Sequence, residues 1–277
     1  MYKEILYSIE DQVAVISINR PETLNALTDL TQAEIRHALN SSDKNPDVIG
    51  NVITGMGRGF CSGVDMNSLS AMSEAGKRLG DAHPHLATSH ENPLNDANYK
   101  DGITYLLALR KPLVAAINGA CAGLGFSLAT FCDLRFVDRT AKLTTSFAQR
   151  GLIAEHGTSW MLPRLVGPAH ALDLYWTSRK FDGEEAFRIG FATHLCETGE
   201  CVTDATRYLR DIAKTSAPNS IMMMKRQVYR HLNRELGPAM EESNVWMDES
   251  LAKGDFKEGV QSFVERRAPN FSRIEVE

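Results

Sequence analysis

Two glycine-rich stretches decide the fold of this chain: Gly-Met-Gly-Arg-Gly-Phe-Cys-Ser-Gly at residues 55–63 and Gly-Ala-Cys-Ala-Gly-Leu-Gly at residues 119–125. Each follows a short apolar run, at 48–53 and at 113–117, which predicts a buried strand. Glycine lets the backbone approach a ligand closely, and N–H groups at the start of a helix have no acceptor within it. Two such N–H groups aimed at one point would form an oxyanion hole, whereas two tight turns without a ligand would explain the same glycines.

Neither stretch has the pattern of a nucleotide-binding loop. A P-loop requires G-x-x-x-x-G-K-[ST] and a dinucleotide turn requires G-x-G-x-x-G, and residues 55–63 and 119–125 match neither. The net charge of −5 indicates no general surface for nucleic acid or for an anionic membrane. We therefore expect no nucleic-acid partner and no membrane partner.

The rest of the chain alternates between strand and helix signals, which predicts an α/β fold. Further strands are expected at 13–18 and 134–137, and helices at the segments 29–39, 126–131, 220–232, 240–251 and 256–267. The pattern becomes wholly helical near residues 195–205. We accordingly expect a core over residues 1–200 and a helical region over residues 201–277. The polar segment 70–98 is interpreted as a loop that borders a ligand channel.

Composition places the chain among globular proteins of a reducing compartment. It has 277 residues, of which 43% are hydrophobic and 23% charged, so a sizeable core can be buried. No run reaches the ~18 apolar residues of a membrane-spanning helix, and the first ten residues do not resemble a secretory signal. Five cysteines without a C-x-x-C pair indicate free thiols, a cytoplasmic location and no metal site.

Several segments, in one order along the chain, resemble motifs of the crotonase (enoyl-CoA hydratase/isomerase) superfamily. They are Asn19-Arg20-Pro21 with Asn25-Ala26-Leu27, Gly59-Phe60-Cys61-Ser62-Gly63-Val64-Asp65-Met66, Lys111-Pro112-Leu113-Val114-Ala115-Ala116-Ile117-Asn118-Gly119, Ala120 to Gly125, Cys132-Asp133, and Phe263 to Phe271. Each match is weak alone, but together they span nearly the whole chain.

The resemblance implies a fold, a substrate and an assembly. The fold is a crotonase-like spiral of ββα units with two roughly perpendicular sheets and a C-terminal helical trimerisation region. The substrate is an acyl-CoA, with coenzyme A as its carrier and no further cofactor. The assembly is a homotrimer, often paired into a hexamer. The backbone N–H groups of Val64 and Leu124 are the oxyanion hole that the resemblance implies.

The resemblance also assigns residues around the substrate. Binding positions in the two turns fall on Cys61, Gly63, Asp65 and Gly123, although the aspartate also suits a turn or a helix cap. Two aromatic side chains are expected to line the pocket, Phe147 and Trp160. Candidate contacts to the coenzyme A phosphates are Arg20 and Arg58. The alternative interpretation, that both are solvated surface arginines, is equally consistent with the sequence.

The chain departs from the family hydratases at the two glutamates that activate water. Those positions are Ser127 and Phe147 here, and neither residue can serve as an acid or a base. Residues 151–157, Gly-Leu-Ile-Ala-Glu-His-Gly, instead resemble a turn of the Δ3,Δ2-enoyl-CoA isomerases that carries a single acid, here Glu155. Apolar neighbours raise the pKa of a carboxyl group, and we expect such neighbours around this residue from four side chains: Leu152, Ile153, Trp160 and Met161.

These features predict a double-bond isomerase that converts a 3-enoyl-CoA to a 2-enoyl-CoA. Glu155 would remove a proton from C2 and return it at C4, with His156 as a possible assistant or a wall of the pocket. Three alternatives remain open from the sequence. Glu155 could be a solvated loop residue, it could activate water in a hydratase or hydrolase of an unusual acyl-CoA, or the chain could bind acyl-CoA without catalysis.

Overall fold

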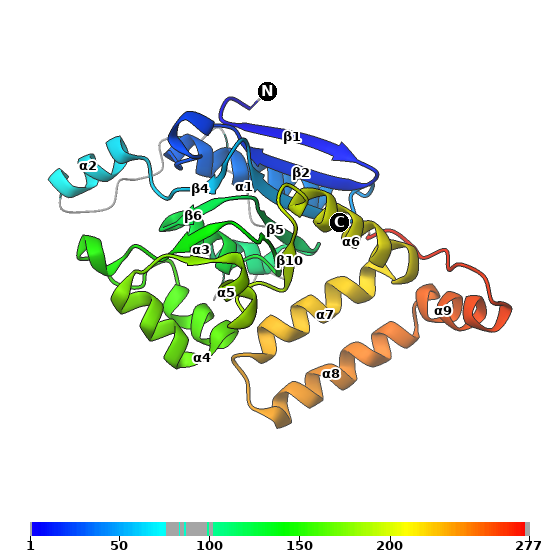
Figure 1. Cartoon of the computed structure of the whole chain (residues 1–277). Coiled ribbons are helices and arrows are strands. Elements are labelled where there is room, and N and C mark those ends of the chain that lie inside the picture. The colour runs from blue at the N-terminus through cyan, green and yellow to red at the C-terminus, as the bar shows by residue number, and fades with distance from the viewer. Residues whose placement is uncertain (1, 76–82, 84–85, 87–98, 100–101, 275–277) are drawn as a thin grey trace.

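The computed structural model describes residues 2–75, 83, 86, 99 and 102–274, and in it two sheets share the core (Figure 1). The larger sheet has six strands in the order β1-β2-β3-β5-β7-β10, and the smaller has four in the order β4-β6-β8-β9. All neighbouring strands are parallel except β1 with β2 and β8 with β9. The predicted α/β class is confirmed.

The elements have the following bounds. The larger sheet contains β1 Ile5–Glu10, β2 Val13–Ile18, β3 Gly50–Gly55, β5 Leu113–Ile117, β7 Leu134–Asp138 and β10 His194–Cys196. The smaller contains β4 Gly59–Cys61, β6 Ala120–Ala122, β8 Lys142–Thr144 and β9 Phe181–Asp182. The α-helices are α1 Asp29–Lys44, α2 Met66–Ala75, α3 Leu124–Thr130, α4 Thr158–Thr177, α5 Gly183–Arg188, α6 Cys201–Thr215, α7 Pro218–His231, α8 Leu236–Leu251 and α9 Gly254–Glu265. Short 3-10 helices are η1 Pro21–Thr23, η4 Thr104–Ala108 and η5 Ala148–Arg150.

A repeated crossing between the sheets creates the spiral. β3, β5 and β7 of the larger sheet are each followed after a few residues by a strand of the smaller sheet, namely β4, β6 and β8. A helix follows each pair: α2, α3 and α4. Because these crossings repeat in one direction, the partner strands in both sheets are parallel. The glycine turns lie just after the crossings, where two sheets and a helix meet.

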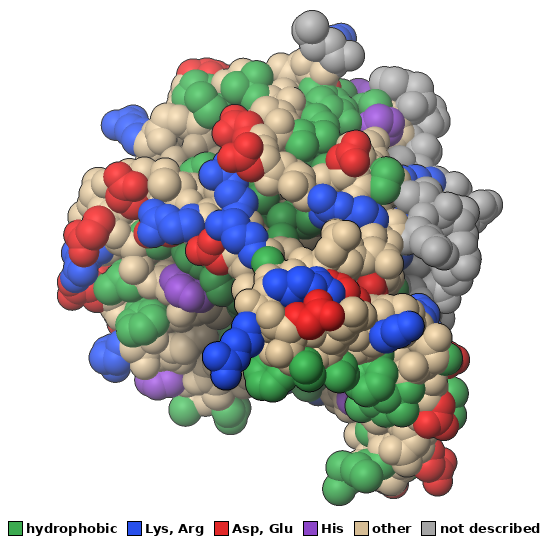
Figure 2. Space-filling view, turned by 90° about the vertical axis from the view of Figure 1, so that its right-hand side faces the viewer, with side chains coloured by type: hydrophobic (Ala, Val, Ile, Leu, Met, Phe, Trp, Pro, Cys, Tyr) green, Lys and Arg blue, Asp and Glu red, His purple; other side chains and the backbone are tan. Residues whose placement is uncertain are grey.

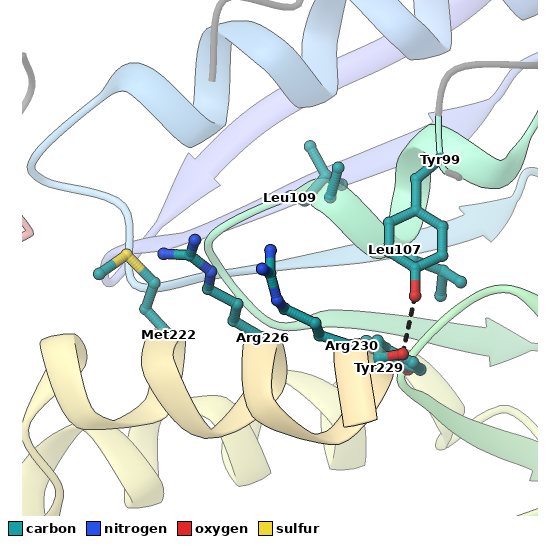
Figure 3. Close-up of a pocket in the computed structure, with 8 residues that line it drawn as sticks. Tyr99, Leu107, Leu109, Met222, Arg226, Tyr229 and Arg230 are labelled. Atoms are coloured by element: carbon teal, nitrogen blue, oxygen red, sulfur yellow. Dashed lines mark hydrogen bonds between the residues drawn. The ribbon is translucent and has the colours of Figure 1, made fainter. Parts of the chain in front are cut away.

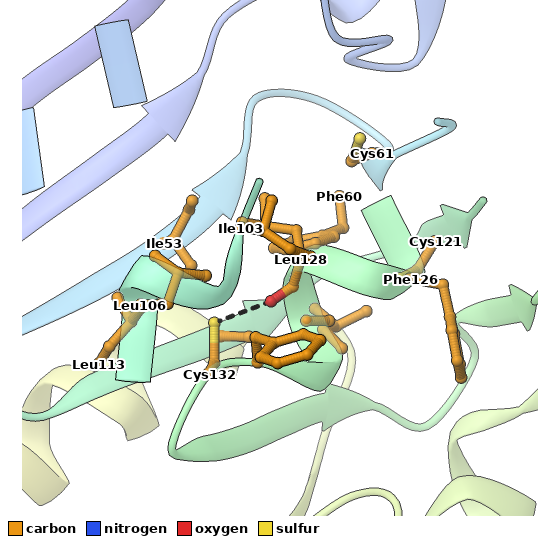
Figure 4. Close-up of a cluster of buried hydrophobic side chains, with 14 of the residues drawn as sticks. Ile53, Phe60, Cys61, Ile103, Leu106, Leu113, Cys121, Phe126, Leu128 and Cys132 are labelled. Carbon is orange, nitrogen blue, oxygen red and sulfur yellow. Dashed lines mark hydrogen bonds between the residues drawn. The ribbon is translucent and has the colours of Figure 1, made fainter. Parts of the chain in front are cut away.

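The core explains why the central strands read as continuous apolar runs. Every residue of β3 and of β5 is buried, as expected for parallel strands that are covered on both faces. α6 packs against one face of the larger sheet, and the smaller sheet with α3 lies on the other side. Figure 4 shows part of this interior, where the Cys132 thiol donates to the Leu128 carbonyl at 3.4 Å.

Most predicted elements are confirmed, with shifted ends. The strands expected at 13–18 and 113–117 are β2 and β5, and the strand expected at 48–53 is β3 at Gly50–Gly55. The helix expected at 29–39 continues to Lys44, and α3 begins at Leu124 rather than at residue 126. Most of the segment 70–98 lies outside the described residues; its first residues, up to Ala75, are the end of α2.

The C-terminal helices form a layer beside the sheets (Figure 1). α7 is fastened to the core through Asp133, whose carboxylate accepts from Lys225 Nζ at 2.8 Å and from the Tyr229 hydroxyl at 2.8 Å. α8 packs on α7, and α9 packs on α8. Within the part of the chain that the structure describes, no helix has the length and apolarity needed to cross a bilayer.

Candidate active site

The two glycine turns contact each other at the start of α3. A Cβ on Gly63 would lie 3.2 Å from the Ala122 carbonyl oxygen and 3.6 Å from the Leu124 nitrogen. Gly63 has a φ of +111°, and Gly123, the N-cap of α3, has a φ of +52° and a ψ of −122°. Side chains rarely allow this backbone conformation, so glycine is needed at both positions. The structure therefore brings together the turns that the sequence analysis singled out.

The pairing of Val64 leaves its N–H group pointing away from its neighbouring segment. The Leu27 N–H donates to the Gly63 carbonyl at 2.7 Å, and the Asp65 N–H donates to the Leu27 carbonyl at 2.9 Å. Because successive N–H groups of an extended segment point to opposite sides, the Val64 N–H faces away from Leu27. Among the described residues it has no acceptor.

The Leu124 N–H is the first of α3 and has no acceptor within the helix. The preceding N–H, of Gly123, donates to the Thr144 carbonyl at 3.3 Å, and the Ser127 N–H donates to the Gly123 carbonyl at 3.0 Å. The described part of the chain offers no acceptor to Leu124 itself. Two unused N–H groups from adjacent turns, one of them at a helix N-terminus, are suited to binding an oxygen that gains negative charge.

Glu155 lies in the turn that precedes α4. Its carbonyl accepts from the Thr158 N–H at 3.1 Å and from the Thr158 hydroxyl at 2.8 Å, which fixes the turn. Its carboxylate oxygen Oε1 lies 3.5 Å from His156 Nε2, and its side chain is 23% exposed. Gly157 places this turn against α3, since a Cβ there would be 3.0 Å from Cζ of Phe131. The carboxylate is thus partly buried, beside an imidazole.

The four side chains expected around Glu155 differ in exposure. Met161 is buried and Trp160 packs against the core. Leu152 is 41% exposed and Ile153 is 82% exposed, so the expectation is wrong for these two. They lie in the segment between η5 and the Glu155 turn.

The two positions that carry glutamates in the family hydratases hold no titratable group. Ser127 is fully buried, and its hydroxyl donates to the Gly123 carbonyl at 3.2 Å. Phe147 is 3% exposed and its ring lies 6.2 Å from that of Tyr175. These environments suit packing, and neither side chain can activate water.

The remaining candidate residues divide into buried and exposed groups. Burial raises the pKa of the Cys61 thiol to about 12, which disfavours the nucleophilic thiolate. Arg58 is exposed in the turn between β3 and β4. Arg20 is half-buried and donates to the Ala26 carbonyl and the Asp65 carboxylate. Sequence reasoning missed the Arg20–Asp65 ion pair, although both residues lie in the quoted motifs.

A pocket between η4 and α7 lies apart from these residues (Figure 3). Two residues of its lining are joined by a hydrogen bond, in which the Tyr99 hydroxyl donates to the Tyr229 carbonyl at 2.7 Å. None of the predicted site residues lines it; its walls are Tyr99, Leu107, Ala108, Leu109, Met222, Arg226, Tyr229 and Arg230. This pocket is therefore distinct from the two N–H groups.

Comparison with known proteins agrees with this fold. The family model for enoyl-CoA hydratase/isomerase matches residues 8–273, and the chain belongs to this family, whose solved members share the crotonase fold. A crystal structure of an enoyl-CoA hydratase/isomerase from Mycobacterium paratuberculosis has a TM-score of 0.84 and 26% identity, with all of each chain covered.

Among curated relatives, both isomerases and hydratases are similar to this chain. A peroxisomal Delta(3,5)-Delta(2,4)-dienoyl-CoA isomerase of Arabidopsis thaliana is 30% identical over 96% of this chain and 94% of its own. A 1,2-epoxyphenylacetyl-CoA isomerase of Escherichia coli is 29% identical over 98% of this chain and 99% of its own. A probable enoyl-CoA hydratase of Mycobacterium bovis is 30% identical over 98% of each. The chain thus belongs to a family whose members are named for different reactions.

Proposed function

We propose that the protein moves a double bond in an acyl-CoA from the 3 to the 2 position by a 1,3-proton shift. Glu155 removes a proton from C2 and returns a proton at C4. The N–H groups of Val64 and Leu124 bind the thioester oxygen while the substrate is an enolate. Coenzyme A is the carrier of the substrate, and the reaction calls for no further cofactor.

The observation that carries this proposal is the replacement of the hydratase acid pair. Water addition needs a base that activates the water and an acid that protonates the α-carbon, and both groups must be present in the same site. Ser127 and Phe147 occupy those positions and are buried in packing roles. A proton shift needs one group that can be base first and acid afterwards, and Glu155 is a carboxylate in the turn where the resemblance expects it.

The oxyanion hole accounts for the difficult part of such a reaction. A thioester α-proton leaves only if the charge that develops on oxygen is stabilised, and a single well-placed donor contributes about 3 kcal/mol in known oxyanion holes. The Leu27 pairing and the start of α3 hold the backbone on either side of the two N–H groups, which supports this role. Two relatives named isomerases are consistent with this chemistry.

A second candidate is water addition or hydrolysis of a special acyl-CoA. The specific observation in its favour is His156, whose Nε2 lies 3.5 Å from Glu155 Oε1 and could serve as a second acid–base group. Relatives named as probable hydratases are equally similar to this chain. The isomerase proposal and this alternative differ in product mass.

The test incubates the purified protein with 3-enoyl-CoA and 2-enoyl-CoA of several chain lengths, separates the isomers by liquid chromatography against authentic standards, and determines the product masses by mass spectrometry. We expect 3-enoyl-CoA to give 2-enoyl-CoA of unchanged mass, with little 3-hydroxyacyl-CoA. In deuterated water, deuterium in the product reports exchange of the Glu155 proton with solvent before its return. A main product heavier by one water, or release of free coenzyme A by hydrolysis, at a rate above that of isomerisation would disprove the isomerase and support the alternative.

We also propose that the protein is a cytoplasmic homotrimer or hexamer. The exposed apolar side chains of α8 and α9 support self-association. The five cysteines are free and buried, which suits a reducing compartment. The net charge of −5 supports the absence of nucleic-acid and membrane partners.

A further inference from the structure

Residues 20–28, between β2 and α1, lie along the segment that carries the Val64 N–H. The Ser62 N–H donates to the Leu24 carbonyl at 2.9 Å, and the Leu27 and Asp65 pairings follow in register. The side chain of Asn25, fully buried, donates to the Gly59 carbonyl at 2.6 Å. This register decides which N–H of the segment 62–65 points away from residues 20–28, because a slip of one residue would turn Val64 inward.

An ion pair between Arg20 and Asp65 stabilises this pairing at the Asp65 end of the segment 62–65. Arg20 Nη1 donates to the Ala26 carbonyl at 2.5 Å, and Arg20 Nη2 lies 3.0 Å from Asp65 Oδ2. The other carboxylate oxygen of Asp65 accepts from the Asn67 N–H at 3.0 Å. The side chains of the pair are 17% and 10% exposed. One guanidinium thus joins residues 20–28 to the residue directly after Val64.

The charges of the pair also bear on the site. Burial opposes ionisation of Asp65, but the hydrogen bonds from Arg20 and Asn67 and the Arg20 charge lower its pKa below 3.8, so it is a carboxylate at neutral pH. A negative charge one residue from an oxyanion donor would oppose an enolate. Arg20 offsets part of that charge, because it lies 3.0 Å from Asp65 and also 3.6 Å from Glu4.

We propose that Arg20 and Asp65 are positioning residues for the oxyanion hole, in which the ion pair holds the Val64 N–H in line and partly neutralises the charge beside it. This inference rests on the proposed function, since it takes the Val64 N–H to bind the thioester oxygen. It replaces the expectation that Arg20 contacts a phosphate of coenzyme A. The guanidinium is bound on one side by the Ala26 carbonyl and on another by Asp65, with Glu4 3.6 Å away.

The expected signature is a loss in kcat with little change in KM, because the enolate needs the aligned N–H more than the bound substrate does. We expect Arg20→Met to lower kcat by about 10- to 100-fold, less than the 10²–10³-fold typical when a donor is removed outright. Arg20→Lys should recover part of this loss, since it keeps the charge but not the two-sided contact. Asp65→Asn should also lower kcat, because we expect the loss of the ion pair that holds the register to outweigh the removal of a negative charge.

A matched control is the ion pair of Arg110 with Asp43. The distance from Arg110 Nε to Asp43 Oδ2 is also 3.0 Å, and the two side chains are 14% and 8% exposed. This pair joins the end of α1, which contains Asp43, to the segment just before β5. Arg110→Met removes a comparable half-buried arginine from a different part of the fold. We expect kcat to stay within about twofold of wild type for this variant, given that distant sites act independently.

A direct readout uses butanoyl-CoA labelled at its thioester carbonyl as the probe. Hydrogen bonds to that oxygen lower its carbonyl stretching frequency, which infrared difference spectra of the bound probe report without any turnover. We expect a clear downward shift with the wild type and Arg110→Met, and the loss of at least half of it with Arg20→Met and Asp65→Asn. An unchanged shift in the folded Arg20→Met and Asp65→Asn proteins would overturn the inference.

The same spectra separate this inference from the proposed function. A wild-type carbonyl shift that depends on Arg20, with no isomerisation of 3-enoyl-CoA, would keep the positioning role and reject the isomerase. No carbonyl shift in the wild type would reject the oxyanion hole itself and the positioning role with it. Should Arg20→Met fail to fold, Arg20→Lys and Asp65→Asn carry the test by the same criteria.

Discussion

Glu155 is the residue on which the proposed chemistry depends, and its neighbours show how far sequence reasoning reaches. The motif predicts that it lies in a turn. In the structure its Oε1 lies 3.5 Å from Nε2 of the His156 imidazole, and the Glu155 side chain is 23% exposed. A carboxylate that is neither fully buried nor fully solvated can exchange a proton with a substrate and remain accessible to it. Ile153, expected to shield it, faces solvent instead.

Replacing Glu155 by glutamine tests the proton-transfer role. The amide keeps the size of the side chain but cannot accept a proton, so we expect kcat to fall by about 10²–10⁴-fold, the usual contribution of a general base. Binding of acyl-CoA should change little, as measured by titration calorimetry with butanoyl-CoA. Glu200→Gln, at an exposed position ahead of α6, is the control and should keep wild-type rates. Wild-type turnover in Glu155→Gln would rule out the mechanism.

Residue-level prediction succeeds where the motif fixes the backbone and fails where partners are distant. The glycines predict two tight turns, and Gly63 and Gly123 do have left-handed φ values, which favour glycine. Arg20 and Asp65 are 45 positions apart, and an arginine can reach solvent, a phosphate or a carboxylate equally well. Only the fold decides between these, since it sets which strands lie side by side.

At the scale of elements, Gly125 is where the two turns are held together. A Cβ there would lie 2.4 Å from the Cys61 carbonyl oxygen and 2.6 Å from the Cys61 Cβ, so α3 and β4 touch through this glycine. Both atoms belong to a buried strand that cannot move aside without breaking its pairing with β6. α3, which begins at Leu124, therefore packs against β4 with no room for a methyl group at Gly125.

We expect Gly125→Ala to destabilise the fold by about 1–3 kcal/mol, as overpacking of a well-filled core does. The folded fraction should also lose most of its activity, because α3 must shift away from β4. Chemical denaturation measures the first effect, and kcat per folded molecule measures the second. Gly237→Ala in α8 is the matched control: nothing lies within 4 Å of its added methyl, so it should be neutral or slightly stabilising. Equal behaviour of the two variants would contradict the argument.

A lysine links the end of α1 to the start of β5. The last carbonyl groups of a helix lack partners within it, and Lys111 Nζ supplies one by donating to the Ser42 carbonyl at 2.7 Å. It also donates to the Asn45 carbonyl. Burial lowers the pKa of Lys111 to about 8, although the Asp43 charge raises it in part. Keeping the Lys111 ammonium charged in the folded state therefore lowers the free energy of unfolding, by an amount that depends on pH.

The sign of that dependence follows from proton counting. The unfolded chain has a lysine pKa near 10.5, so between pH 8 and 10.5 the unfolded state binds more protons than the folded state at this residue. The free energy of unfolding contributed by Lys111 then rises with pH across that window. We expect Lys111→Met to reduce this rise, measured as urea unfolding curves from pH 7 to 10. Lys214→Met, on the exposed side of α6, should keep the wild-type slope.

Some elements carry no signal that sequence reasoning can use. β4, β6 and β8 have three residues each, too short for an alternating pattern to show. α4 contains Pro163 and Pro168 and bends at Gly167, whose φ of +78° is not helical, so no uninterrupted helical run was visible there. These strands and this helix exist because the sheets and α3 pack against them, which is tertiary information.

At the scale of the whole molecule, the C-terminal layer leaves apolar side chains in solvent. α8 and α9 expose several of them at more than half of their area: Leu236 78%, Met240 55%, Val245 57%, Met247 58%, Phe256 53%, Val260 51%, Phe263 85% and Val264 72%. Figure 2, viewed from the side of α9, shows hydrophobic groups along the lower part of that face. Single exposed apolar residues are common, whereas a cluster of this size indicates an interface.

We expect this interface to join copies of the chain, and Phe263→Glu to weaken it. When the apolar interface forms, the introduced carboxylate loses its water without gaining a partner charge. This makes the free energy of association less favourable by several kcal/mol for each copy. Light scattering after size exclusion should give a trimeric or hexameric mass for the wild type and a smaller mass for Phe263→Glu at the same concentration. Ser41→Glu adds the same charge on the exposed side of α1 and should leave the mass unchanged. A monomeric wild type over the micromolar range would contradict the assembly, and an unchanged mass in Phe263→Glu would place the interface away from the end of α9.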